Sequence, residues 1–396
     1  MTFKKKIILI VLGILATASL TATVFGMKVL NDAENSFNKT FQPLKGKSAD
    51  HSHVDATQPF SVLLLGIDTG DVGRTEKWVG RSDSMMVVTV NPVKKQTTVL
   101  SLDRDVLTHL VDIPESLDGT ILPNPDKMNH AYAYGGVEAS VATISALVGI
   151  KIDYYAAVNM EGLADLVNAV GGVTVDNKYS AAMPNEYPKE VPTAEEGKGF
   201  VVSDGSKGRT FVPYGKHLLN GETALAYARM RHQDPEGDIG RQKRQREVVQ
   251  LIVKKLLSVD SVGNYQKIFD ASSKNLKTDL PFEQLMKIAE GYSNAMDHVE
   301  MMQLQGIEAN IPGGYYQLVP KAELLQAQNI LKEQMGLPTS ETIEDPETVT
   351  YESFTGNPAP EEIDPVISGG TSSSSHGSST TQSSTDSTDT SSENAE

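Results

Sequence analysis

Two aspartates stand where a metal ion could be bound. Asp68 closes the apolar run Leu-Leu-Leu-Gly-Ile-Asp, and Asp83 follows in Gly-Arg-Ser-Asp, just before a second apolar run. Side chains at the carboxyl ends of strands line the usual ligand crevice of an open α/β sheet. Two carboxylates there would suit Mg²⁺, which takes one or two protein carboxylates and completes its shell with water and phosphate oxygens. The alternative, which the spacing alone favours, is that both aspartates cap turns beside strands.

Arginines near the same predicted strand ends are suited to phosphate. Arg81 precedes Asp83, and Arg104 lies in Ser-Leu-Asp-Arg-Asp after a third apolar run. A guanidinium group offers a planar fork of charge-assisted hydrogen bonds that matches a phosphate group. The alternative is a surface ion pair between Arg104 and Asp103 or Asp105.

The strongest local signal is a pair of arginines after a predicted helix. If that helix ends near Ala228, extended backbone at Arg229, Met230 and Arg231 points both guanidinium groups to one side and Met230 to the other. Two guanidinium forks would then converge on one ligand.

A second helix follows and begins with a polar face. Arg241 and Gln245 are four residues apart and share a helix face that continues into apolar positions. Asp238 is placed to cap this helix, and a helix N-terminus itself favours phosphate. The other basic residues of the helix are expected to form a solvated face: Lys243, Arg244 and Arg246.

The elements that must position these residues alternate between strand and helix, which is typical of a layered α/β domain. The continuous apolar run from Val62 to Leu65 predicts a central strand that is covered on both faces. The predicted strands are Ser61–Ile67, Ser84–Val90, Gln96–Leu102 and Val173–Val175. The predicted helices are Val137–Val148, Met160–Val170, Asn220–Ala228, Arg241–Leu257, Phe282–Tyr292 and Lys321–Met335. All of these elements fit a single catalytic domain, residues 59–336.

The N-terminal end predicts a membrane anchor. Residues 1–6 include three lysines, and residues 7–27 are uncharged, apolar and roughly long enough to cross a bilayer as a helix. Because the lysines precede this stretch, the N-terminus is expected to be cytoplasmic and the remainder extracytoplasmic. A cleaved signal peptide is the alternative. The polar residues 28–58 are expected to form an extracytoplasmic spacer.

The C-terminal end carries most of the negative charge. The formal net charge is −16, and from Glu341 onward there are twelve acidic residues and no Lys or Arg. The Ser/Thr run from Thr371 to Ser392 has no apolar residues to offset the entropy of ordering. Residues 337–396 are therefore predicted to be disordered, and a chain ending at Pro338 is expected to keep both its stability and its chemistry.

Taken in order, these motifs resemble those of the LytR-CpsA-Psr family over roughly residues 59–260. The matching segments are Leu-Leu-Leu-Gly-Ile-Asp68, Arg81-Ser-Asp83-Ser, Ser-Leu-Asp-Arg104-Asp105, Lys127-Met-Asn129-His-Ala-Tyr, Gly171-Gly-Val, Asn220-Gly-Glu-Thr-Ala-Leu-Ala-Tyr-Ala-Arg229-Met-Arg231 and Gly-Arg241-Gln-Lys-Arg-Gln245. One departure is Asp103, where the family often has proline. This leaves the local backbone in doubt but not the charged groups that follow it.

The resemblance implies an α/β/α domain with a mixed central sheet and a hydrophobic tunnel for a polyprenyl chain. At the mouth of the tunnel it implies a pyrophosphate that is bound by basic residues and Mg²⁺. Asp68 and Asp83 carry over as the metal ligands. The pyrophosphate ligands that carry over are Arg81, Arg104, Lys127, Arg229, Arg231, Arg241 and Gln245.

The function that the resemblance implies is transfer of a glycopolymer, a teichoic acid or a capsular polysaccharide. The donor is a polyprenyl pyrophosphate carrier, and the acceptor is a peptidoglycan sugar hydroxyl in a Gram-positive envelope. The expected partners are therefore the lipid-linked polymer, peptidoglycan and the membrane, and no nucleic acid.

Phosphoryl transfer needs mainly positioned charges, so arginines and a metal ion would suffice for this chemistry. The catalytic candidates are Arg104, Asp105, Arg229 and Arg231, and Asp105 or Asp83 could take the hydroxyl proton. The alternatives are a polyprenyl pyrophosphatase and a non-enzymatic lipid-binding or regulatory protein of the envelope.

Overall fold

A seven-stranded mixed sheet forms the centre of the fold. In spatial order its strands are β13 (Leu276–Thr278), β8 (Tyr154–Asn159), β1 (Phe60–Asp68), β2 (Arg81–Asn91), β3 (Gln96–Leu102), β14 (Val299–Leu304) and β17 (Ile367–Gly370). β1 is parallel to β8 and β3 is parallel to β14, and the other neighbours are antiparallel. The computed structural model describes residues 34–35, 39–44, 58–68, 78–178, 199–203, 209–230, 234, 237–256, 274–281, 284, 287–288, 295, 298–360 and 367–370.

Helices and short hairpins surround this sheet. The helices are α2 (His130–Val148), α3 (Met160–Ala169), α4 (Gly221–Arg229), α5 (Gly237–Leu256), α8 (Lys321–Gln334) and α9 (Tyr351–Thr355). The small antiparallel pairs are β4 (Leu107–Thr108) with β7 (Asp126–Lys127), β5 (Ser116–Leu117) with β6 (Thr120–Ile121), β9 (Val173–Asn177) with β12 (Gly215–Leu219), β10 (Gly199–Ser203) with β11 (Arg209–Pro213), and β15 (Ile307–Ile311) with β16 (Gly314–Leu318).

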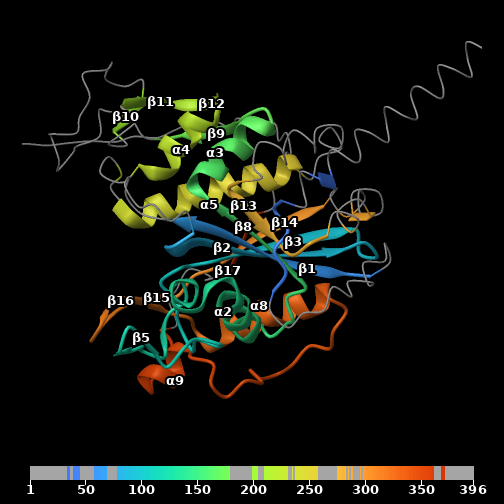
Figure 1. The fold of residues 1–396 in the computed structure, drawn as a ribbon. Helices are drawn as coiled ribbons and strands as arrows, with labels where there is room; N and C mark the ends of the chain where they lie inside the picture. The colour runs from blue at the N-terminus through green and yellow to red at the C-terminus, as the bar shows by residue number, and fades with distance from the viewer. Residues whose placement is uncertain are drawn as a thin grey trace, which may run out of the picture.

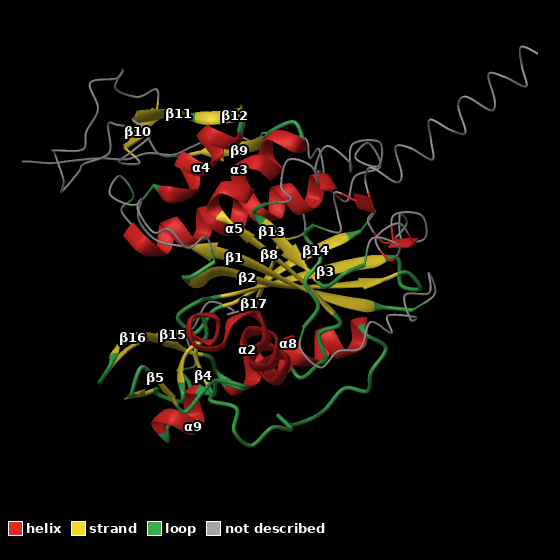
Figure 2. Cartoon of the chain, viewed as in Figure 1, coloured by secondary structure: helices red, strands yellow, loops and turns green. Residues whose placement is uncertain are grey.

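The helices cover both faces of the sheet. Figures 1 and 2 show α3, α4 and α5 on one face and α2 and α8 on the other. On the α2/α8 face, buried side chains of β1, β2 and β3 pack against both helices. On the opposite face, Val249 of α5 packs against Met86 and Val88 of β2. The α/β/α architecture with a mixed central sheet is therefore confirmed.

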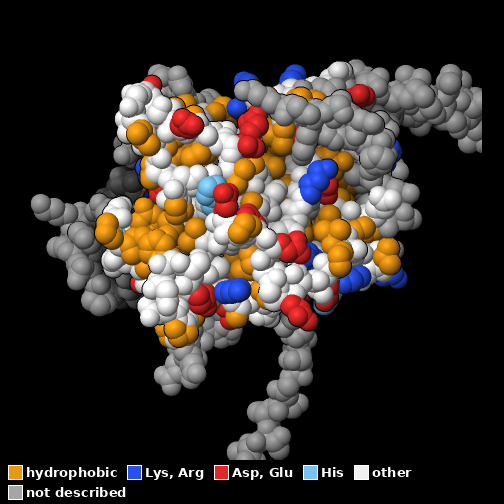
Figure 3. All heavy atoms as spheres, turned by 90° about the horizontal axis from the view of Figure 1, so that it is seen from below, with side chains coloured by type: hydrophobic (Ala, Val, Ile, Leu, Met, Phe, Trp, Pro, Cys, Tyr) orange, Lys and Arg blue, Asp and Glu red, His pale blue; other side chains and the backbone are white. Residues whose placement is uncertain are grey.

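The face covered by α2 and α8 has no charged field of one sign. Figure 3 shows this side with acidic and basic side chains spread among hydrophobic patches. Concentrated potentials of one sign are what draw charged ligands to a surface. An anionic substrate is therefore not expected to be drawn to this face by a collective field.

The predicted strands agree closely with the observed ones. β3 has the predicted bounds, and β1 is one residue longer at each end. β2 begins earlier than predicted, at Arg81, so Asp83 lies inside the strand rather than before it. β1 is central, as the apolar run from Val62 to Leu65 predicted, with helices on both sides.

Two helices begin earlier than predicted. α2 starts at His130, but Gly136 interrupts it with a φ of 69° and a ψ of −152°, a backbone conformation that favours glycine. The interruption explains why the helical period becomes readable only after Val137. α5 starts at Gly237, so Asp238 lies in the first turn and not at the cap. Of the predicted helix 282–292, only residues 284, 287 and 288 belong to the described part of the chain.

Part of the predicted N-terminal spacer packs onto the domain. Phe41 forms a bridge with Thr278 of β13, and the Gln42 N–H donates to the Thr278 carbonyl at 2.7 Å. Leu44 belongs to the buried core. Across the part of the chain that the structure describes, no helix is long and apolar enough to cross a membrane. The predicted anchor at residues 7–27 lies outside that part.

The segment after α8 also packs onto the domain, which differs from the predicted disorder from residue 337. Ser340 and Asn329 exchange two hydrogen bonds of 2.8 and 2.9 Å. Val349 and Tyr351 pack against a buried cluster of Leu107, Tyr316 and Leu318. The error arose because acidic and proline residues dominate the composition here, whereas a few apolar side chains provide the packing. Residues 371–396 lie outside the described part.

A chain ending at Pro338 is therefore expected to melt roughly 5 °C below a matched chain ending at Gly370, because it loses the apolar contacts of Val349 and Tyr351. Thermal unfolding of the two purified chains checks this. Equal melting temperatures would show that the segment contributes no stability, as the sequence predicted.

Candidate active site

The C-terminal ends of β1 and β3 and the N-terminal end of β2 lie at the same end of the central sheet. Asp68, the last residue of β1, pairs with Arg81, the first residue of β2. The register then shifts, because Ile67 pairs with Ser82 but Gly66 pairs with Ser84. Asp83 is thus the extra residue of a β-bulge, a device that redirects a side chain.

The bulge depends on a glycine. A Cβ atom added to Gly66 would lie 2.9 Å from the Ser84 Cβ, closer than real Cβ contacts allow. The two strands can therefore approach each other at the bulge only with glycine at this position. This close approach helps to set the position of Asp83.

Arg104, which follows β3, reaches Asp83 on β2. Its Nη1 donates to Asp83 Oδ2 at 2.6 Å, and its Nε donates to Asp105 Oδ2 at 3.3 Å. The ion pair with Asp105 that was the structural alternative is thus present. The same guanidinium also contacts Asp83 on β2, and this contact brings it into the predicted site.

A third segment reaches the same cluster from the start of α2. Lys127 Nζ donates to Asp105 Oδ1 at 2.7 Å. Asn129 Nδ2 donates to Asp83 Oδ1 at 3.3 Å, and the Asn129 N–H donates to the Arg104 carbonyl at 3.2 Å. Lys127 and Asn129 both lie in one matched motif, but the sequence assigned no role to Asn129.

The first half of α5 supplies the remaining contacts. Arg241 Nη2 lies 3.7 Å from Asp83 Oδ2. Gln245, one turn later, is buried, and both polar atoms of its amide lack a hydrogen-bond partner among the described residues, as does Ser84 Oγ. These two side chains border a small cavity of about 10 Å³, which has room for about one water molecule. Polar atoms without a hydrogen-bond partner at this position are suited to bind the oxygens of a ligand.

The electrostatics of Asp83 favour a cation beside it. Burial raises the pKa of Asp83, and the negative charge of Asp68 raises it further, whereas Arg104, Arg241 and the Asn129 hydrogen bond act in the opposite direction. The proximity of the two aspartates is what a two-carboxylate metal site requires. Each carboxylate oxygen has two lone pairs, so Asp83 can still accept a ligand.

The predicted solvated face of α5 is correct for Lys243 and wrong for Arg244 and Arg246, which are 3% and 5% exposed. Arg244 donates to Asp234 and to the carbonyls of Tyr227 and Met230. These bonds join the end of α4 to α5. The burial of Arg244 could have been predicted from the helical period, because Arg244 lies four residues before the buried Val248 and so on the same helix face.

Arg246 stabilises the loop that carries Arg104 through a contact with Asp103. Its Nη1 lies 3.7 Å from Asp103 Oδ2, and Asp103 Oδ1 accepts the Asp105 N–H at 3.0 Å. Burial raises the pKa of Asp103 and lowers that of Arg246. Asp103, the departure from the family motif, thus fixes the backbone that carries Arg104.

A second polar cluster adjoins the first and was not predicted. Asp126 is buried and accepts hydrogen bonds from the Tyr134 hydroxyl at 2.9 Å and the Tyr316 hydroxyl at 3.2 Å. His130 Nδ1 lies 2.6 Å from Asp126 Oδ2. Part of this cluster could have been predicted from the sequence, because Asp126, His130 and Tyr134 follow one another at intervals of four residues. Lys127 lies between the clusters, with its Nζ 5.3 Å from the centroid of the Tyr316 ring.

The contacts described above do not join Arg81, Arg229 or Arg231 to the Asp83 cluster. Arg81 is exposed. It lies close enough to Tyr134 that its positive charge opposes the rise that burial causes in the pKa of the Tyr134 hydroxyl. Arg229 lines a cavity of about 230 Å³ between α3, α4 and the β10–β11 hairpin. Arg231 lies outside the described residues. Met230 is buried, and Arg229 is the last residue of α4, so its backbone is helical and not extended as predicted.

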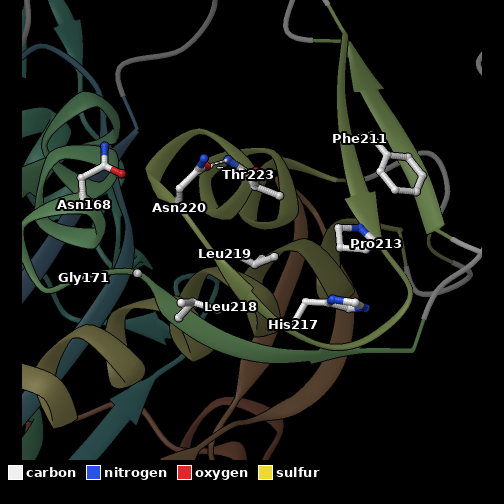
Figure 4. A pocket seen from close by; sticks show the side chains of 10 residues that line it. Asn168, Gly171, Phe211, Pro213, His217, Leu218, Leu219, Asn220 and Thr223 are labelled. Carbon is white, nitrogen blue, oxygen red and sulfur yellow. Dashed lines mark hydrogen bonds between the residues drawn. The ribbon is translucent and has the colours of Figure 1, made fainter.

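The larger hollow shown in Figure 4 is not suited to pyrophosphate. It has a volume of about 350 Å³ and lies beside the β9–β12 pair and the start of α4. Its lining is Asn168, Gly171, Gly172, Phe211, Pro213, His217, Leu218, Leu219, Asn220 and Thr223. None of these is an arginine or a lysine, the side chains that bind phosphate most strongly. The charged cluster at the sheet edge therefore remains the better phosphate site.

Comparison with known sequences gives a consistent family. The LytR_cpsA_psr family model matches residues 23–333. Biofilm regulatory protein A of Streptococcus mutans is 41% identical over 360 residues, covering 90% of this chain and 83% of that protein. The polyisoprenyl-teichoic acid-peptidoglycan teichoic acid transferase TagU of Enterococcus faecalis is 42% identical over 331 residues, covering 84% of this chain and 98% of that protein.

Solved structures share the fold. A Streptococcus agalactiae protein matches with a TM-score of 0.65 and 39% identity, covering 78% of this chain and 98% of that chain. A structure of TagT bound to LIIa-WTA matches with a TM-score of 0.55 and 28% identity, covering 75% of this chain and 99% of that chain.

Proposed function

The chain belongs to the LytR_cpsA_psr family, and from this premise we propose that it transfers a glycopolymer from a polyprenyl pyrophosphate carrier to a peptidoglycan sugar hydroxyl. The observation that carries the proposal is the network in which Arg104, Lys127 and Arg241 surround Asp83 and Asp105. The TagU relatives, named as teichoic acid transferases, supply the polymer class.

The basic side chains of this network are held ready for a pyrophosphate. Arg104 is fixed by two carboxylates and Lys127 by one, so neither side chain must be ordered when the donor binds. Donors that are positioned in advance stabilise the charge that develops on phosphate oxygens in the transition state. The bridging oxygen of the departing polyprenyl phosphate gains the most from this stabilisation.

The proposal includes Mg²⁺, with Asp68 and Asp83 as its protein ligands. When bound, the ion would withdraw charge from the phosphate oxygens. The residues fit it, because burial and the charge of Asp68 both raise the pKa of Asp83, and a cation between the two carboxylates would oppose both effects.

The direct test supplies a purified full-length protein with a lipid-linked polymer donor and a peptidoglycan acceptor. The expected result is polymer attached to the acceptor together with release of polyprenyl phosphate. Release at the same rate without acceptor would identify a pyrophosphatase, and binding without release would identify a lipid-binding protein.

The proposal also places the domain outside the cell, with residues 7–27 as its anchor. A cysteine introduced at Ser372 is expected to react with a membrane-impermeant thiol reagent on intact cells. Reaction only after lysis would contradict this topology.

A further inference from the structure

The buried carboxylate of Asp126 fixes the proton on His130. Asp126 is 2% exposed and accepts bonds from the Lys127 N–H at 2.8 Å, the Tyr134 hydroxyl at 2.9 Å and the Tyr316 hydroxyl at 3.2 Å. Burial opposes ionisation, but the hydrogen bonds to His130 and its other partners hold the pKa of Asp126 below its ordinary value. Because the ionised carboxylate has no proton to give, the 2.6 Å contact requires a proton on His130 Nδ1.

The other ring nitrogen of His130 is left able to accept a proton. A neutral imidazole with a proton on Nδ1 carries a lone pair on Nε2. Within the described ranges, Nε2 has no hydrogen-bond partner, and the His130 side chain is 18% exposed. The ring is therefore oriented from one side and accessible from the other, which is the arrangement of a general base.

The segment that carries His130 also contacts the charged cluster. His130 follows Asn129, which donates to Asp83, and Lys127 of the same segment donates to Asp105. On the other side, Arg81 opposes the effects of burial and Asp126, which raise the pKa of the Tyr134 hydroxyl to about 12. The His130 ring contacts Asp126, the hydroxyls of Tyr134 and Tyr316 bond to the same carboxylate, and Arg81 on β2 lies near Tyr134.

The two aspartates considered from the sequence are less suited to take a proton. Asp105 accepts from Lys127 on one oxygen and from Arg104 on the other. Asp83 accepts from Arg104 and Asn129 and lies beside Arg241. Protonating either carboxylate would break a contact that positions an arginine or a lysine.

We propose that His130, oriented by Asp126, is the general base that takes the proton from the acceptor hydroxyl. This inference rests on the proposed transfer function. Nε2 accepts the hydroxyl proton while the oxygen forms the new bond to the polymer-side phosphorus. The bond from that phosphorus to the bridging oxygen breaks, and its electron pair leaves with polyprenyl phosphate. The imidazolium, paired with the Asp126 carboxylate, then releases its proton to solvent.

The test is His130→Gln in the full-length protein, measured with saturating lipid-linked donor and peptidoglycan acceptor. The maximal transfer rate is expected to fall about 100-fold or more, which is the usual contribution of a general base. Donor affinity is expected to change less than twofold. The acid limb in the pH profile of kcat/KM for the wild type is expected to disappear in the variant.

Two further variants separate a chemical role from a structural one. His130→Ala is expected to regain at least tenfold in rate when imidazole is added, which a damaged fold would not do. His109→Gln is the matched control, because the His109 ring contacts Glu347 at 3.2 Å and not Asp126, and its rate is expected to stay within twofold of the wild type.

The outcomes distinguish this inference from the function on which it rests. A wild type that transfers polymer, with a His130→Gln variant of equal rate and unchanged pH profile, would overturn the role of His130 alone. A wild type that binds the donor but never transfers polymer to the acceptor would overturn the proposed function and the inference with it.

Discussion

Replacing Arg104 by alanine is expected to lower polymer transfer by about 100- to 1,000-fold, the usual effect of losing a preorganised donor to a developing oxyanion. Arg104 contacts both Asp83 and Asp105. Its removal takes away a phosphate donor and also releases the two carboxylates that orient the neighbouring cations. The measurement is the rate of polyprenyl phosphate release in the presence of acceptor.

Controls distinguish loss of the phosphate donor from loss of the fold. Arg104→Lys keeps the charge but lacks the planar fork, so it is expected to recover less than a tenth of the wild-type rate. Lys243→Ala removes an exposed cation from the helix that carries Arg241, and its rate is expected to stay within twofold. Full activity in Arg104→Ala, with an unchanged melting temperature, would remove Arg104 from the site.

The double variant Asp68→Asn, Asp83→Asn is expected to lose both transfer and the response to Mg²⁺. Asparagine keeps the size of each side chain, but it removes the negative charge that would hold a divalent ion. The wild-type rate is expected to rise as Mg²⁺ is added to protein treated with a chelator. The double variant is expected to stay at least 100-fold slower at every Mg²⁺ concentration.

A stability measurement accompanies this prediction. Because burial raises the pKa of Asp83, its charge opposes folding at neutral pH, so removing that charge partly offsets the lost contacts with Arg104 and Arg241. The variant is therefore expected to remain folded. A double variant with a wild-type Mg²⁺ response would show that the two carboxylates do not bind the metal.

Strands β1, β2 and β3 and most of the helices could be predicted because their signals are local, whereas the sheet strands β8, β13, β14 and β17 were not predicted. The apolar run of β1 and the bounds of β3 are properties of short segments. The predictions failed where a distant segment decides the outcome. Composition predicted that residues 337–396 are disordered, but Val349 and Tyr351 pack against Leu107 and Tyr316.

The candidate site was predicted in part for the same reason. The sequence identified Asp83, Arg104, Lys127 and Arg241 by residue type and motif, and the fold brings all four into one network. Arg81 and Arg229 are not joined to that network by a direct contact. Their predicted roles as pyrophosphate ligands therefore remain proposals.

The sequence alone determined which residues could do chemistry, because charge, hydrogen-bonding capacity and the order of motifs are carried by residue type. It also determined the α/β pattern, because periodicity acts over neighbouring residues. Tertiary structure alone decided how those residues face one another. The bulge at Gly66 redirects Asp83, and the fold buries Arg244 and Arg246. Tyr316 reaches Asp126 across 190 residues of sequence. A contact of that separation depends on how the β15–β16 pair packs against the β4–β7 pair, which no short stretch of sequence specifies.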